Sequence, residues 1–203
     1  MLDTHARKHV QPIIEKTANG LLKLGLSANG VTWIAFFIGL SSGLFIFLDS
    51  PVIAVFVLWI SGFLDAVDGT MARLTKPSPW GTVLDVTFDR IVEISVIIGL
   101  AVAFPQAQLS LLLLSVSIII SMTIFLTVGA LSEKQGMKSF YYQAGLAERT
   151  EGFILFSLMI LFTKYLIVIT LLFFIIELYT ALQRILEAKK ILNQMGGGSR
   201  EKI

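Results

Sequence analysis

The stretch LDAVDGTMARLTKPSPWGTVLDVTFDR, residues 64–90, decides how this chain folds. It places four of the six aspartates of the protein, Asp65, Asp68, Asp85 and Asp89, inside or beside two apolar segments. A carboxylate near a bilayer costs several kcal/mol of desolvation unless a cation or a water pathway compensates its charge. Four close together also repel one another, so bound divalent metal is the simplest compensation. Metal at a membrane surface suggests phosphate chemistry.

The composition predicts an integral membrane protein. Of 203 residues, 55% are hydrophobic, and the mean hydropathy is +0.81. A soluble domain cannot bury that much apolar surface. Cysteine is absent, which excludes disulfides and thiolate ligands or nucleophiles. Mixed polar and charged residues precede the first apolar run, so we expect no cleavable signal peptide.

Six apolar stretches predict an all-α polytopic protein with six transmembrane helices. The second and fifth are short for a hydrocarbon core about 30 Å thick. We therefore expect the second to continue through Arg73 and the fifth to begin near Ala147. The apolar stretches are residues 31–48, 52–64, 83–104, 109–131, 153–162 and 165–182.

Basic residues predict the orientation. Of 16 Lys and Arg residues, only Lys164 falls in the three connections that a cytoplasmic N-terminus would leave outside. Cytoplasmic loops carry the excess of Lys and Arg. We expect a multi-pass protein of the inner or plasma membrane, with both termini and the four aspartates facing the cytoplasm.

Three regions follow from this pattern. Residues 1–25 are expected to form an amphipathic helix on the inner membrane surface, because apolar residues recur at helical spacing. Residues 26–190 form the six-helix membrane domain, and residues 191–203 a flexible cytoplasmic tail. The positions at helical spacing in the first helix are Val10, Ile13, Ile14, Thr17, Leu21 and Leu24.

The aspartates are spaced to share a site. Asp65 and Asp68 are three residues apart and Asp85 and Asp89 are four apart, so each pair occupies one helix face. A short connection makes the two helices antiparallel neighbours whose aspartate faces can meet. An all-oxygen site suits Mg²⁺, Mn²⁺ or Ca²⁺ rather than zinc.

Residues between the aspartates add phosphate-binding features. Gly69, Ala72 and Gly81 are small enough to let another helix, or a nucleotide and its phosphates, approach closely. Arg73 carries a planar donor fork suited to a phosphate.

The whole pattern resembles the signature of the CDP-alcohol phosphotransferases, membrane enzymes that join a CDP-activated lipid to an alcohol and release CMP. All eight fixed positions are present in order, and the stretch LSANGVT, residues 26–32, resembles the Pro-Asn-x-x-Thr motif of the family with Ala28 in place of proline. The signature here reads Asp65-x2-Asp68-Gly69-x2-Ala72-Arg73-x7-Gly81-x3-Asp85-x3-Asp89.

The resemblance implies roles by position. Asp65, Asp68 and Asp85 would hold metal, and Asp89 would complete a site for two ions, Mg²⁺ or Mn²⁺, and act as general base. The donor would be CDP-diacylglycerol or a related CDP-lipid, and the protein a homodimer. Residues implied to contact the CDP-lipid are Asn29, Thr32, Gly69, Arg73, Ser78 and Gly81.

A second inner loop is a candidate acceptor site. Lys134, Lys138 and Arg149 could bind a phosphate on a polyol acceptor such as inositol phosphate or glycerol phosphate. The run AERTE, residues 147–151, resembles a motif of the inositol-phosphate-using branch, although Gly152 stands where that motif has a second arginine. The alternative is ordinary positive-inside topology with glutamates at a helix N-terminus.

Two further acidic residues lie deep in predicted helices. Glu93 and Glu177 either line a polar acceptor cavity or pair with Arg90 and Arg184.

Three other functions fit parts of the pattern. An aspartate-rich prenyltransferase also uses carboxylate-bound Mg²⁺ but repeats its aspartate motif in separate parts of a longer bundle. A cation or proton transporter, or a purely structural ion-paired cluster, would explain intramembrane carboxylates. Neither the transporter nor the structural cluster requires the accompanying Gly69, Ala72-Arg73 and Gly81 at fixed offsets.

Overall fold

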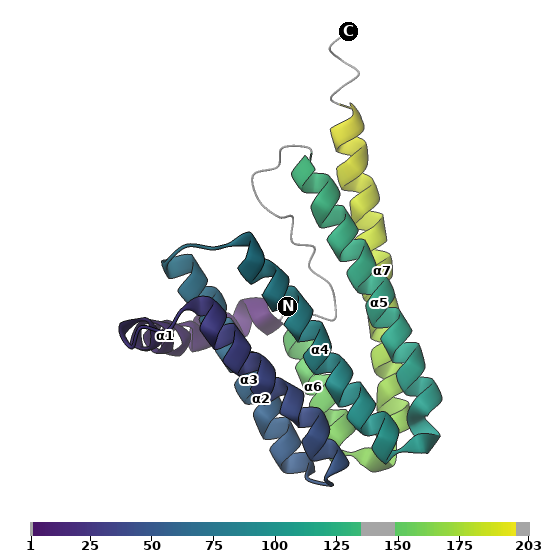
Figure 1. Ribbon diagram of the computed structural model, residues 1–203. Coiled ribbons are helices and arrows are strands. Elements are labelled where there is room, and N and C mark those ends of the chain that lie inside the picture. Colours follow the sequence, from purple (N-terminus) through teal and green to yellow (C-terminus); the bar gives the residue numbers. More distant parts are fainter. Residues whose placement is uncertain (1, 135–148, 198–203) are drawn as a thin grey trace.

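The protein is a bundle of helices in the computed structural model, which describes residues 2–134 and 149–197 (Figure 1). Within these residues it has seven α-helices, two short 3₁₀ helices and no strand, so the predicted all-α class is confirmed. The elements are α1 Leu2–Lys23, α2 Ala28–Phe47, α3 Pro51–Leu74, α4 Pro79–Ala103, η1 Pro105–Ala107, α5 Gln108–Lys134, α6 Arg149–Leu161, η2 Thr163–Tyr165 and α7 Leu166–Gly197.

Local sequence explains where the helices around the aspartates begin. Ser27 caps α2 by accepting a hydrogen bond from the Gly30 amide at 3.1 Å. Ser78 caps α4 in the same way through the Gly81 amide at 3.0 Å. A proline opens both α3 and α4, where its missing N–H costs nothing. Helix α3 runs to Leu74, so Asp65, Asp68 and Arg73 share one continuous helix, as predicted.

Within residues 2–134 and 149–197, four helical segments are long and apolar enough to cross a membrane. The protein is a multi-pass membrane protein. These segments are Ala28–Phe47, Pro51–Leu74, Pro105–Leu131 and Thr163–Lys190. Helix α4 falls outside this group; it carries two aspartates and the Arg90–Glu93 pair. Helix α6 has only 13 described residues. The count of six spans therefore stays a prediction.

Helix α1 crosses the end of the bundle at an angle to the other helices (Figure 1). Ile14 and Ala18 are buried against α2 and α3, in a cluster with Val67 and Met71. Ile13, on the other side, is 60% exposed. The predicted helix is confirmed. One of its sides packs against the bundle, and Ile13 on another side remains exposed.

Part of the segment expected to be a flexible tail, residues 191–203, is helical. Helix α7 continues to Gly197, so residues 191–197 are helical, and residues 198–203 lie outside the described part. The segment LNQM before the glycines contains no helix breaker, and a helix already formed extends at little cost.

Helix α2 is the central element because α3 and α4 both pack against it. Ser42 and Ser61 fix the α2–α3 contact by donating to the carbonyls of Ala54 and Ala35, at 3.0 and 2.7 Å. At the α2–α4 crossing the backbones touch, and a Cβ added at Gly43 would lie 2.3 Å from the Ser95 carbonyl oxygen. Small residues allow such close approach between membrane helices.

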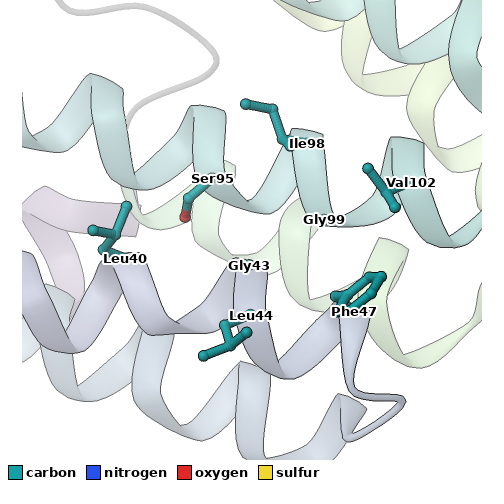
Figure 2. Close-up of a pocket in the computed structure, with 8 residues that line it drawn as sticks. All are labelled: Leu40, Gly43, Leu44, Phe47, Ser95, Ile98, Gly99 and Val102. Atoms are coloured by element: carbon teal, nitrogen blue, oxygen red, sulfur yellow. The ribbon is translucent and has the colours of Figure 1, made fainter.

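An apolar groove of about 450 Å³ lies between α2 and α4 at this crossing (Figure 2). Leu40, Leu44 and Phe47 of α2 face Ile98 and Val102 of α4 across it. Such a lining suits hydrocarbon and offers almost nothing to a polar substrate. The chemistry must therefore be sought elsewhere, at the charged end of the same helices.

Helices α5 and α7 form a second pair that packs side by side. In Figure 1 this pair leans away from α4 toward the end where the C-terminus lies. Helix α6 contacts both α3 and α7, so it connects the α2–α3–α4 group to this pair.

We predict that Gly43→Ala destabilises the protein by about 1–3 kcal/mol, because the new methyl group meets backbone that cannot rotate away. Thermal unfolding in detergent measures the effect. Gly152→Ala is the matched control, since its Cβ would lie 3.7 Å from the Phe173 ring, an ordinary contact. Equal unfolding temperatures for the two variants would contradict the proposed backbone contact between α2 and α4.

Candidate active site

Three aspartates converge at one end of the bundle. Asp65 and Asp68 on α3 and Asp85 on α4 each offer a carboxylate oxygen, and these oxygens all lie within 4.8 Å of one another. Asp68 is buried, while Asp65 and Asp85 are partly exposed. The predicted meeting of the two aspartate faces is thus observed.

The convergence depends on α2 more than on the α3–α4 connection. Each of the two helices packs more extensively on α2 than on the other, so the predicted neighbours face each other mainly through their side chains.

Arg149, the first residue of α6, lies between the carboxylates of the two helices. Its Nη1 donates to Asp65 Oδ2, and its Nη2 donates to Asp89 Oδ1 at 2.6 Å. The guanidinium carbon also lies 5.6 Å from the centre of the Phe153 ring. One guanidinium therefore joins an aspartate of α3 to an aspartate of α4.

The donor set fits a divalent cation. Asp68 Oδ2 is buried and has no hydrogen-bond partner within the part of the chain that the structure describes. A buried anionic oxygen without a partner is costly, and hard cations such as Mg²⁺ and Mn²⁺ bind carboxylate oxygens. Arg149 contacts Asp65 and Asp89 but not this oxygen, so a cation held with Asp65 and Asp85 would compensate it.

The beginnings of α2 and α4 lie together beside the carboxylates. A Cβ added at Gly81 would lie 3.0 Å from Asn29 Oδ1 and 3.1 Å from Ser78 Oγ. Three of the predicted CDP-lipid residues are thus neighbours. Both helices point their N-terminal amides toward this end, and such amides favour phosphate groups.

Two more predicted residues occupy the last turns of α3. Arg73 is exposed, and its Nη2 donates to the Thr70 hydroxyl at 2.8 Å. A Cβ at Gly69 would lie 3.6 Å from Arg73 Nη1, so the arginine lies over the glycine. Thr70 is a neighbour that the sequence pattern did not single out.

A small cavity connects Thr32 of α2 to the charged residues. The sequence predicted Thr32, Asp65, Asp89 and Arg149 as site residues, and all four line this cavity. It missed the others, which carry no charge or motif: Ala35, Phe36, Ser61, Phe88 and Val92. A helical-wheel argument could have found Phe36 and Phe88, which lie next to site positions.

The three candidate acceptor residues have different outcomes. Arg149 lies at the carboxylates. Lys138 and the side chain of Lys134 lie outside the described residues, so their role stays a prediction. Of the two deep glutamates, Glu93 pairs with Arg90 at 2.5 Å. Arg184, the predicted partner of the second glutamate, Glu177, donates to the Ser121 hydroxyl at 2.8 Å.

The sequence pattern of the CDP-alcohol phosphatidyltransferases matches residues 26–184. The chain belongs to the CDP-alcohol phosphatidyltransferase family. It is therefore a transferase enzyme of phospholipid synthesis, and the family finding sets aside the prenyltransferase and transporter alternatives.

Two relatives cover most of the chain. The inner membrane protein YnjF of Escherichia coli is 32% identical, over 81% of this chain and 84% of its own. The archaetidylinositol phosphate synthase of Pyrococcus horikoshii is also 32% identical, over 94% of this chain and 97% of its own.

The solved structures agree with the fold. The crystal structure of Mycobacterium tuberculosis phosphatidylinositol phosphate synthase with CDP-DAG bound has a TM-score of 0.69 and 25% identity, covering 87% of this chain and 94% of the other. A second structure of that enzyme, in complex with manganese and citrate, has a TM-score of 0.68 at 25% identity, covering 86% and 88%. The known enzyme thus binds a CDP-lipid and a divalent metal on the same fold.

We predict that Asp85→Asn weakens Mn²⁺ binding by at least about tenfold, because metal affinity follows the number of charged ligands. Titration of the purified protein, with free Mn²⁺ followed by its electron paramagnetic resonance signal, measures this. Asp49→Asn is the control: Asp49 lies in the turn between α2 and α3, with φ 52°, a conformation that asparagine adopts readily. Unchanged Mn²⁺ binding in Asp85→Asn would contradict the assigned ligand set.

Proposed function

We propose that the protein transfers a phosphatidyl-type group from a CDP-linked lipid to a phosphorylated polyol, with inositol phosphate as the first candidate, and releases CMP. The observation that carries this is the placement of Arg149. Its guanidinium lies directly against the carboxylates of Asp65 and Asp89, where an acceptor must bring its hydroxyl. A cation there favours an acceptor that carries a phosphate.

The relatives support the donor and the acceptor class. The M. tuberculosis structure contains CDP-DAG, and both that enzyme and the P. horikoshii relative are inositol phosphate lipid synthases by name. The donor would occupy the end of the bundle where Asn29, Ser78 and Gly81 meet. Arg73 could turn from Thr70 to a phosphate of the donor.

Four aspartates would hold two divalent ions, Mg²⁺ or Mn²⁺, that neutralise the diphosphate and stabilise the departing CMP. Asp65, Asp68 and Asp85 supply the convergent oxygens, and Asp89 completes the set. The site would face the cytoplasm of a six-span homodimer, since the Lys and Arg residues concentrate at this side.

The chemistry requires one proton transfer. The acceptor hydroxyl oxygen attacks the lipid-bearing phosphorus, the bond to the bridging oxygen breaks, and CMP leaves with the electron pair. Asp89 lies outside the convergent trio, and only its Oδ1 is bonded to Arg149, so its second carboxylate oxygen would accept the hydroxyl proton. Arg149 would orient the acceptor by its phosphate.

CMP release from CDP-diacylglycerol and Mg²⁺ tests the proposal, with inositol phosphate, glycerol phosphate, inositol and serine as acceptors. We expect a phosphorylated polyol to give the highest rate. Absence of CMP release with every acceptor would contradict the reaction, and a higher rate with inositol or serine would contradict the acceptor class.

We predict that Asp89→Asn lowers turnover by roughly 10²–10⁴-fold, the usual contribution of a general base, while largely keeping CDP-lipid binding. Asp49→Asn makes the same chemical change at the opposite end of the bundle and serves as control. Normal turnover in Asp89→Asn would exclude Asp89 as the base.

A further inference from the structure

The guanidinium of Arg149 occupies carboxylate oxygens in the site proposed for the divalent ions. It bonds to Asp65 and Asp89 together. Asp89 therefore lies in an ion pair, whereas Asp68 and Asp85 have no bond to Arg149. Arg149 thus separates the four carboxylates into two that it binds, Asp65 and Asp89, and two that it does not bind, Asp68 and Asp85.

We infer that Arg149 is an exchangeable cation that couples the second divalent ion to the acceptor phosphate. An ion that binds through Asp89 Oδ1 and Asp65 Oδ2 must displace the guanidinium from these two oxygens. The displaced guanidinium is then free to bind the acceptor phosphate beside the site. This inference rests on the proposed function for the identity of the acceptor, but the competition for carboxylates does not.

The location of Arg149 makes such an exchange physically reasonable. It is the first described residue of α6, and its guanidinium reaches across to carboxylates of both α3 and α4. Its side chain is 32% exposed, so the described residues enclose it only in part. A guanidinium keeps its charge under all conditions, so it leaves the carboxylates only by moving.

Electrostatics sets the direction of the coupling. With the guanidinium between them, Asp65 and Asp89 are already compensated, and a divalent ion must replace that interaction to bind. A phosphate that draws Arg149 away exposes the two carboxylates and strengthens ion binding. By thermodynamic linkage, the ion strengthens phosphate binding by the same factor.

The nearby Arg90 provides a contrast. It is also partly buried and follows Asp89 directly, but its ion pair is with Glu93 at 2.5 Å. Removing its charge changes the local field without freeing an aspartate oxygen. It therefore separates competition for ligand atoms from a general effect of positive charge.

Mn²⁺ binding to the full-length protein in detergent tests the inference without any turnover. Free Mn²⁺ is measured by its electron paramagnetic resonance signal, at fixed free ion concentrations, with and without inorganic phosphate. We expect Arg149→Gln to tighten the weaker Mn²⁺ binding step, and phosphate to tighten it in the unsubstituted protein, each by about five- to 150-fold, the usual range of coupling between sites.

The variants define what would overturn the inference. Phosphate should tighten Mn²⁺ binding much less in Arg149→Gln. Arg149→Lys should be intermediate, because an ammonium keeps the charge but lacks the planar donor fork of the guanidinium. The inference fails if Arg149→Gln binds Mn²⁺ no more tightly than the unsubstituted protein, or if Arg90→Gln tightens binding equally. It also fails if phosphate leaves Mn²⁺ affinity unchanged, a measurement that needs no variant to fold.

These results are separable from the proposed function. If Arg149→Gln tightens Mn²⁺ binding and phosphate is coupled to it, while no acceptor yields CMP, then the exchange stands and the reaction is wrong. If CMP is released but Mn²⁺ affinity responds to neither change, the reaction stands and the exchange is wrong.

Discussion

Everything in this fold depends on how four carboxylates are kept together where solvation is poor. Burying an unpaired charge costs more free energy of desolvation than a single favourable interaction contributes. The protein meets this constraint with geometry: α3 and α4 are both held on α2, which fixes the distance between their aspartates. Serine hydroxyls and backbone contact at Gly43 hold that arrangement, and the proposed divalent ions would supply the compensating charge.

The molecule assigns different tasks to different helices. The α2–α3–α4 group carries the proposed metal ligands and the predicted CDP-lipid residues, while α6 contributes the guanidinium of Arg149, which contacts two of the carboxylates. Since α6 contacts both α3 and α7, it joins this group to the pair formed by α5 and α7.

Much of this was predictable from the sequence, because it depends on local patterns. Apolar runs, prolines and capping serines fix the helices around residues 28–103, and aspartates three and four apart share helix faces. The extension of α7 was missed because composition, not helix propensity, suggested a tail there. The contacts of Arg149 with Asp65 and Asp89 could not be predicted from the sequence. Arg149 lies 84 positions from Asp65 and 60 from Asp89, and such distant contacts leave no periodic pattern. The central place of α2 was hidden for the same reason.

The central claim is that the aspartates of α3 and α4 form one cage for divalent ions, and anomalous diffraction tests it most directly. Crystals grown with Mn²⁺ and a CDP-lipid should show two anomalous peaks among Asp65, Asp68, Asp85 and Asp89. Peaks elsewhere in the bundle, or none at all with the CDP-lipid in place, would contradict the account.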